Sequence, residues 1–208
     1  LRRNNLNTVF QFPQEVKDLQ IYFSADNYDA ILSAFPGVCL DMPLYILGSS
    51  TDSAYLAASL GLPYAFATHF APAQFASASM IYHQNFVPSE VLEKPYFISC
   101  VNVIAAESTE EADFLASSFY NLFAGIVTNT RRPLSEPTQE VIYKGIPAIE
   151  QAVQRMASCA FLGDGATIRP EIEKFVQDHK ADEIMATSYI FDDAKCLRSF
   201  SLLKELFS

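Results

Sequence analysis

Short apolar runs alternate with helix-favouring segments along most of this chain. The apolar runs are rich in β-branched and aromatic residues, which is typical of buried strands. The predicted strands cover 43–47, 64–70, 96–105 and 183–190. The predicted helices cover 13–23, 53–60, 72–82, 108–124, 146–160, 167–179 and 192–207. Strands separated by helices form parallel βαβ units, so the pattern predicts an α/β fold with about four parallel strands.

Capping residues support several of these boundaries. Pro13 is expected at the first position of the first helix. Ser108 is followed three residues later by Glu111, which is the pattern of a capping box. Asp164, between two glycines, is interpreted as a helix cap rather than part of a cofactor loop, and Asp192 as the N-cap of the last helix rather than an acid–base group. An open doubly wound sheet and half of a (β/α)8 barrel both fit this order of elements.

Composition narrows the classes of partner. The 208 residues are 50% hydrophobic, so one globular domain over 1–208 is expected. Fourteen basic and 24 acidic residues give a formal charge of −10 without a basic cluster, which disfavours nucleic acid and anionic membrane surfaces as partners. The first residues lack a signal-peptide pattern and no apolar run is long enough to cross a bilayer, so a cytoplasmic location is expected. The four cysteines are widely spaced, and we expect reduced, mostly buried thiols and no metal site.

One turn carries the strongest candidate chemistry. It follows the first predicted strand and contains Gly48, Ser49, Ser50 and Ser53. A glycine allows a sharp turn, and the amides at the start of the next helix, with the serine hydroxyls, can hold a phosphate. The alternative is an ordinary N-cap, which the same residue types also favour.

Two further residues stand where a barrel enzyme would place functional groups. Thr68 and His69 end the second predicted strand. His69 is a candidate for contact with a ring cofactor or substrate, and the alternative is a polar residue held under the next loop. Because strand residues alternate in direction, at most one of the two is expected to point inward. His83 and His179 are interpreted as solvated or capping residues.

The wider sequence resembles the bacterial luciferase-like flavin-dependent monooxygenases. The resemblance rests on segments 47–72, 82–112 and 181–207, and the first of them is the most specific. It implies a (β/α)8 barrel of the TIM type, reduced FMN as cosubstrate, and O₂ with an aldehyde-like or other small organic substrate. It also implies that Gly48, Ser49, Ser50 and Ser53 hold the flavin phosphate after the fifth barrel strand.

The resemblance covers only the second part of such a barrel. We therefore expect the C-terminal half, completed by a second copy in a homodimer or by a complementing barrel half, because a half barrel exposes sheet edges. Two functions stay open. One is a flavin-dependent monooxygenase, and the other is a non-catalytic remnant or a flavin-binding or scaffold protein that pairs with another half.

Overall fold

The computed structural model describes residues 8–40 and 42–208. They fall into two compact units, one that precedes Ile46 and one that covers Ile46–Ser208, and the expectation of a single domain stays a prediction. The first unit contains helix α1 (Thr8–Phe23) and a short 3-10 helix, η1 (Ala25–Asn27). The absence of a signal peptide was inferred from residues that lie outside the described range.

Pro13 lies inside α1 and not at its start, so that prediction is wrong. Proline fixes φ near the helical value, so it can occupy a helix interior when the loss of one backbone hydrogen bond is tolerated.

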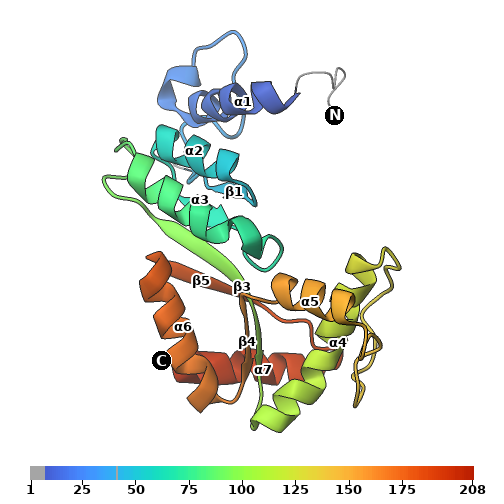
Figure 1. The fold of residues 1–208 in the computed structure, drawn as a ribbon. Helices are drawn as coiled ribbons and strands as arrows, with labels where there is room; N and C mark the ends of the chain where they lie inside the picture. The colour runs from blue at the N-terminus through green and yellow to red at the C-terminus, as the bar shows by residue number, and fades with distance from the viewer. Residues whose placement is uncertain (1–7, 41) are drawn as a thin grey trace. The chain divides into compact units, whose positions relative to one another are not determined.

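The second unit is built on a five-stranded parallel sheet (Figure 1). Its strands are β1 (Ile46–Gly48), β2 (Tyr64–Phe66), β3 (Phe97–Ala105), β4 (Ala160–Gly163) and β5 (Glu183–Thr187). The strands follow the order β1-β2-β3-β4, and β5 also pairs with β3. The first part of β3 pairs with β2, its last part pairs with β4, and its middle pairs with β5. All nine residues of β3 are buried, so this strand is the centre of the sheet.

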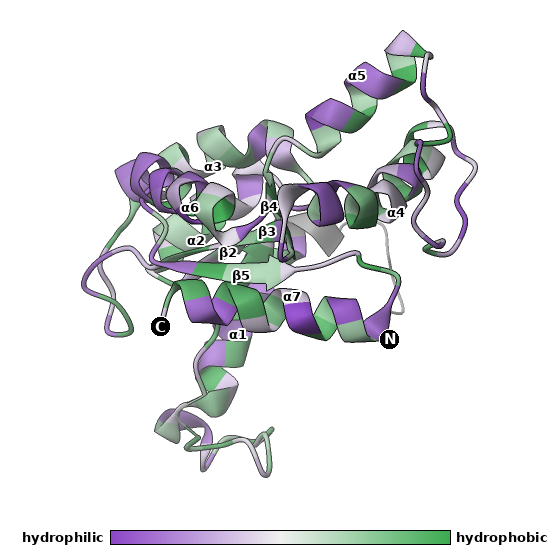
Figure 2. Ribbon diagram, turned by 90° about the horizontal axis from the view of Figure 1, so that it is seen from below, coloured by the Kyte–Doolittle hydropathy of each residue, from purple (hydrophilic) through white to green (hydrophobic). Residues whose placement is uncertain are grey.

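Six helices surround the sheet in this unit. They are α2 (Thr51–Leu60), α3 (Pro72–Asn85), α4 (Thr109–Val127), α5 (Pro147–Met156), α6 (Gly165–His179) and α7 (Asp193–Leu206). Val101 and Val103 of β3 pack against α6 and α7, whereas Ile104 packs against α4 and α5. Successive strand residues face opposite sides, so this end of β3 is covered by helices on both faces. Figure 2 shows the green apolar positions of α6 and α7 beside the sheet.

An aromatic cluster joins β2 and β3 to α3. Tyr64 and Phe75 each stack on Phe97, with ring centroids 5.6 and 5.8 Å apart. Phe75 also stacks on Phe175 of α6 at 5.1 Å. Offset and tilted ring pairs contribute beyond their buried area, so this cluster fixes α3 and α6 on the same side of the sheet.

The α/β class and the four predicted strands are confirmed, but their limits differ. β4 was not predicted, because its sequence is short and leads directly into a glycine turn. β1 was predicted to be buried on both faces, yet Leu47 is 70% exposed. β2 ends at Phe66 and β5 at Thr187, earlier than the apolar pattern indicates.

The described sheet is open. Within residues 46–208, β1 pairs only with β2 and β5 pairs only with β3. The structure therefore confirms parallel strands with helices, while a closed barrel is not formed by the described residues.

The three predicted N-caps are confirmed, but the Glu111 carboxylate accepts from the Glu107 amide at 3.3 Å and not, as a capping box requires, from the Ser108 amide. The Ser108 hydroxyl accepts a hydrogen bond from the Glu111 amide at 3.2 Å. Asp164 accepts from the Thr167 amide at 2.9 Å, and Asp192 accepts from an amide of α7 at 2.8 Å. These residues satisfy amides that have no partner inside their helices, so the helices begin where the sequence places the caps.

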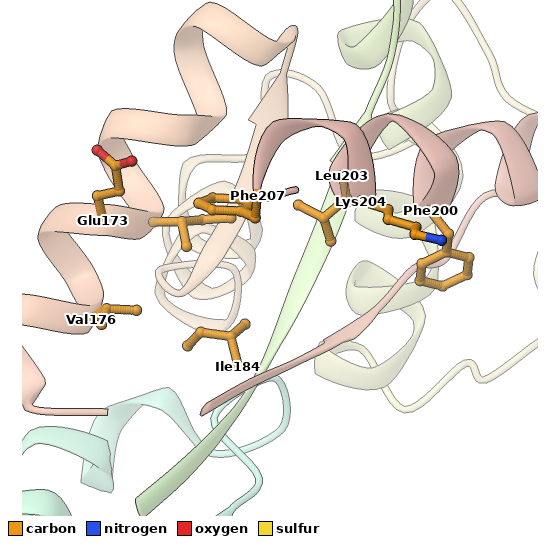
Figure 3. Close-up of a pocket in the computed structure, with 8 residues that line it drawn as sticks. Glu173, Val176, Ile184, Phe200, Leu203, Lys204 and Phe207 are labelled. Carbon is orange, nitrogen blue, oxygen red and sulfur yellow. The ribbon is translucent and has the colours of Figure 1, made fainter. Parts of the chain in front are cut away.

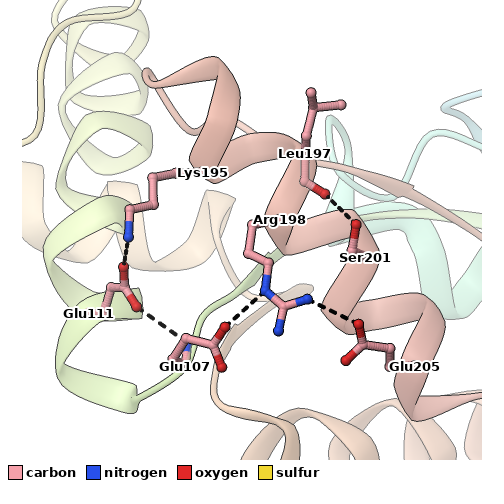
Figure 4. Close-up of polar contacts among 7 residues, drawn as sticks. All are labelled: Glu107, Glu111, Lys195, Leu197, Arg198, Ser201 and Glu205. Atoms are coloured by element: carbon pink, nitrogen blue, oxygen red, sulfur yellow. Dashed lines mark hydrogen bonds and ion pairs between the residues drawn. The ribbon is translucent and has the colours of Figure 1, made fainter.

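Ion pairs hold α7 against the start of α4 (Figure 4). Arg198 bonds Glu107 at 2.8 Å and Glu205 at 3.0 Å, and Lys195 bonds Glu111. These side chains are largely exposed, so each pair adds little stability, and the network mainly fixes the orientation of α7.

None of the described helices is both long and apolar enough to cross a membrane. All four cysteines are free; Cys100 is buried, Cys159 and Cys196 are half-buried, and Cys39 is exposed, so the expectation of mostly buried thiols is not met at Cys39. Burial raises the pKa of the Cys100 thiol.

We predict that Ser199→Ala lowers the free energy of unfolding by about 1–3 kcal/mol. The buried Ser199 hydroxyl accepts the Ala105 amide at 2.8 Å, and the alanine would leave this buried amide without a partner. Urea denaturation measures the change. The matched control is Ser201→Ala on the same helix, since Ser201 is exposed and bonds only its own helix. Equal effects of the two substitutions would contradict this role of Ser199.

Candidate functional site

The turn between β1 and α2 is shaped by close contact between Gly48 and Ser53. A Cβ on Gly48 would lie 1.9 Å from the Ser53 Oγ and 2.3 Å from the Ser53 Cβ. Real side chains do not approach this closely, so only glycine fits while Ser53 is present. The Ser53 hydroxyl donates to the Ser50 carbonyl at 2.7 Å. This bond joins the first turn of α2 to the residue before it.

Tyr64, the first residue of β2, forms hydrogen bonds with the same turn. Its hydroxyl lies 2.8 Å from the Ser53 Oγ and donates to the Ser50 carbonyl at 3.2 Å. The side chain is fully buried. Burial raises the pKa of Tyr64 to about 12, although the hydrogen bond with Ser53 lowers it slightly. Tyr64 is therefore neutral at physiological pH and acts as a fixed support.

The remaining polar groups of the turn lie at the start of α2. Ser50 is the N-cap of α2, yet its side chain makes no capping hydrogen bond. Ser49 and Ser50 are half-buried. The Thr51 amide donates to the Gln74 Oε1 at 3.3 Å, so an acceptor oxygen already lies at the start of α2. The exposed carboxylate of Asp52, in the first turn, opposes an anion there.

Thr68 and His69 lie in the turn after β2 and not in the strand. The alternation of side chains along a strand therefore does not apply to these two residues. The expectation that at most one of them points inward had the wrong basis. Thr68 is fully buried, and its hydroxyl lies 2.7 Å from the Ser99 hydroxyl. The His69 amide donates to the Cys100 carbonyl at 2.7 Å, so β3 fixes the backbone of this turn.

The imidazole of His69 has an unused polar atom. Its Nδ1 is buried and has no hydrogen-bond partner among the described residues. A buried polar atom without a partner is unfavourable, so a group that bonds this nitrogen would be stabilised there. Nδ1 is thus the atom of His69 that is left for the predicted contact with a ring cofactor or substrate.

Sequence reasoning missed a polar group on β3 beside this turn. Asn102 is almost fully buried, and its side-chain amide donates to the His69 carbonyl at 3.4 Å. The Thr187 hydroxyl of β5 donates to the Asn102 Oδ1 at 3.0 Å. The detectable signal was the presence of Ser99 and Asn102 within an otherwise apolar strand.

The other candidates have structural partners. The His83 Nδ1 donates to the Ser79 carbonyl of its own helix at 2.8 Å. His179 was predicted to be solvated or a cap, but its ring packs 4.6 Å from the Phe75 ring and 4.8 Å from the Phe175 ring. Burial lowers the pKa of His179. The described residues contain no cluster of three or more His, Cys, Asp or Glu that could hold a metal ion.

Known proteins similar to this chain include two bacterial relatives. The uncharacterized protein YddN of Bacillus subtilis (strain 168) is 38% identical over 206 residues, which cover 99% of this chain and 61% of that protein. A luciferase-like monooxygenase of Escherichia coli (strain K12) is 37% identical over 206 residues, which cover 99% of this chain and 62% of that protein. The chain thus spans less than two thirds of the length of these relatives. No protein-family model matches it.

Solved structures share the fold. Apo-MsnO8 superposes with a TM-score of 0.78 at 26% identity, covering 95% of this chain and 60% of that chain. The oxygenating constituent of 3,6-diketocamphane monooxygenase from Pseudomonas putida, in complex with FMN, has a TM-score of 0.54 at 14% identity, covering 82% of this chain and 49% of that chain. At this identity the second similarity shows the fold alone.

Gly48→Ala is predicted to destabilise the second unit by about 1–3 kcal/mol, because the new methyl group overpacks the turn. Ser53→Gly removes both contacting atoms. In a double-mutant cycle followed by urea denaturation, the double variant should therefore lose less stability than the sum of the single changes. Strict additivity would show that the contact with Ser53 is not what requires glycine.

Alkaline pH should reveal the burial of Tyr64. Because its pKa is raised in the folded protein, the stability that depends on its neutral form is present below pH 10 and is lost as the pH rises toward 12. Unfolding measured at several pH values should show a steeper alkaline loss for the unmodified chain than for Tyr64→Phe. Tyr55→Phe, on the exposed side of α2, is the matched control. Parallel pH curves for the unmodified chain and Tyr64→Phe would contradict the assignment.

Proposed function

This chain belongs to the luciferase-like monooxygenase family, and on that premise we propose that it serves a flavin-dependent monooxygenase reaction. The reaction would use reduced FMN and O₂ to oxidise an aldehyde-like or other small organic substrate. The observation that carries the proposal is the β1–α2 turn, where Gly48 and Ser53 are in close contact and the Ser50 side chain leaves the helix start uncapped.

The residues of this turn fit a phosphate group. The helix dipole favours an anion at the start of α2, where a phosphate oxygen would take the place of the Gln74 Oε1 as acceptor of the Thr51 amide. Ser49 and Ser50 would supply hydroxyl donors. The Ser53 hydroxyl is already engaged with the Ser50 carbonyl and Tyr64, so its role is to hold the turn in shape. Since the chain carries a net charge of −10, these local donors must act against an unfavourable overall field.

The turn after β2 would face the flavin ring or the substrate. Bound flavin supplies the electron transfer and oxygen chemistry, and the protein supplies binding, orientation and exclusion of water. The buried His69 Nδ1 is the group we assign to a hydrogen bond with the ring or substrate. Thr68 positions that turn through its bond to Ser99. Asn102 supports it from β3 by donating to the His69 carbonyl.

We also propose that the open sheet is completed by further barrel strands. The support is that β1, β4 and β5 each pair with a single strand of the described sheet, together with Leu47 and Met185, which are 70% and 52% exposed. The missing strands would come from a complementing barrel half or from a second copy of the chain. This openness also supports the second candidate function, a non-catalytic flavin-binding or scaffold protein that pairs with another half. A cytoplasmic location stays a prediction.

FMN carries a phosphate and riboflavin does not, so their relative affinities test whether the β1–α2 turn binds phosphate. We predict that the 208-residue chain binds FMN more tightly than riboflavin. Ser49→Ala combined with Ser50→Ala should weaken FMN binding by about a hundredfold or more, because hydrogen bonds to a charged group contribute about 1.5–3 kcal/mol each. Riboflavin binding should not change. Quenching of flavin fluorescence measures both affinities.

Ser59→Ala, on the exposed face of α2, is the matched control and should behave as the unmodified chain. Equal affinity of the unmodified chain for FMN and riboflavin would contradict the phosphate site. FMN binding without aldehyde-dependent oxidation of reduced flavin would favour the scaffold function over the monooxygenase.

A further inference from the structure

A cavity lies between α6, β5 and α7, on the face of the sheet that α6 and α7 cover (Figure 3). Its volume is about 570 Å³, which is within the range of pockets that hold small organic ligands. Six of its eight lining residues are apolar. The lining consists of Ile172, Glu173, Val176, Ile184, Phe200, Leu203, Lys204 and Phe207.

This cavity is separate from the candidate flavin site. Its lining includes no residue of the β1–α2 turn or of the turn after β2. Ile184 is the second residue of β5, near the beginning of that strand, whereas the flavin site is built where β1 and β2 end. In parallel sheets the two ends of a strand lie at opposite edges, so one small ligand would not occupy both places.

The two charged residues of the cavity differ in their partners. Glu173 bonds Arg169 at 2.8 Å, so its charge is compensated within α6. No carboxylate of the described residues forms an ion pair with the Lys204 ammonium. Figure 3 shows this ammonium beside the Phe200 ring. Lys204 therefore places an uncompensated positive charge at the edge of an apolar cavity, in a chain whose net charge is −10.

We propose that this cavity binds a small amphiphile with an apolar body and a single anionic head group. The apolar body would lie among Ile184, Leu203 and Phe207, where it loses contact with water. The anionic head would lie beside Lys204. An uncharged ligand would leave this ammonium unused, and a cationic ligand would be repelled by it. This inference does not depend on the proposed function.

A tryptophan reporter tests the proposal, because the chain contains no tryptophan of its own. Phe200→Trp places one indole in the cavity lining. Phe114→Trp on α4 is the matched control, since Phe114 and Phe200 are 38% and 39% exposed. Dodecanoate, added below the concentration at which it forms micelles, should shift the emission of Phe200→Trp in a saturable way and leave Phe114→Trp unchanged.

The head-group preference tests the role of Lys204. Dodecanoate should bind more tightly than dodecanol, and dodecyltrimethylammonium should bind more weakly than both. Lys204→Met should weaken dodecanoate binding by about threefold to fivefold, the contribution of one solvent-accessible ion pair, and leave dodecanol binding unchanged. Lys94→Met, at an exposed lysine outside the cavity, is the control and should have no effect.

Calorimetry with the unmodified chain checks the same order of affinities without a reporter. Equal emission changes in both tryptophan variants, equal affinity for the anionic and cationic probes, or an emission change that follows self-association in light scattering would each overturn the proposal.

Discussion

The pairing of β3 with three other strands is the constraint on which the second unit depends. Its first residues pair with β2, its last residues with β4, and its middle residues with β5. A strand that is buried along its whole length must have apolar neighbours on both faces, which the aromatic cluster and the helix layers supply. Because β3 also binds the His69 amide through the Cys100 carbonyl, the same strand fixes the turn that we assign to the flavin ring.

The candidate site is held by contacts with strands and not by loops alone. Tyr64 begins β2, stacks on Phe97 of β3, and bonds both Ser50 and Ser53 of the β1–α2 turn. The β1–α2 turn is therefore connected to the central strand through one buried phenol. A preorganised site loses less entropy on binding than a flexible one, which favours a ligand that contributes only a few directional bonds.

Local signals in the sequence were sufficient for the class of fold and for most helix starts. Ser108, Asp164 and Asp192 act within one helical turn of themselves, so their residue types determine their roles. The polar bonds of Asn102 to His69 and Thr187 join residues 33 and 85 positions apart, and no local pattern contains that information. The same limit applies to Ser53: its residue type predicts a phosphate donor, whereas in the fold its hydroxyl bonds Tyr64 of the next strand. β4 was missed because a short edge segment depends on β3 for its structure.

The central claim is that the start of α2 binds the phosphate of FMN. Amide chemical shifts from ¹H–¹⁵N spectra of the chain test it most directly, because they report each backbone donor separately. Our account predicts that FMN shifts the amides of residues 50–53, and that riboflavin leaves these amides unchanged while both ligands affect the turn at His69. Shifts of residues 50–53 that are the same with the two ligands, or FMN-induced shifts confined to other parts of the chain, would contradict it.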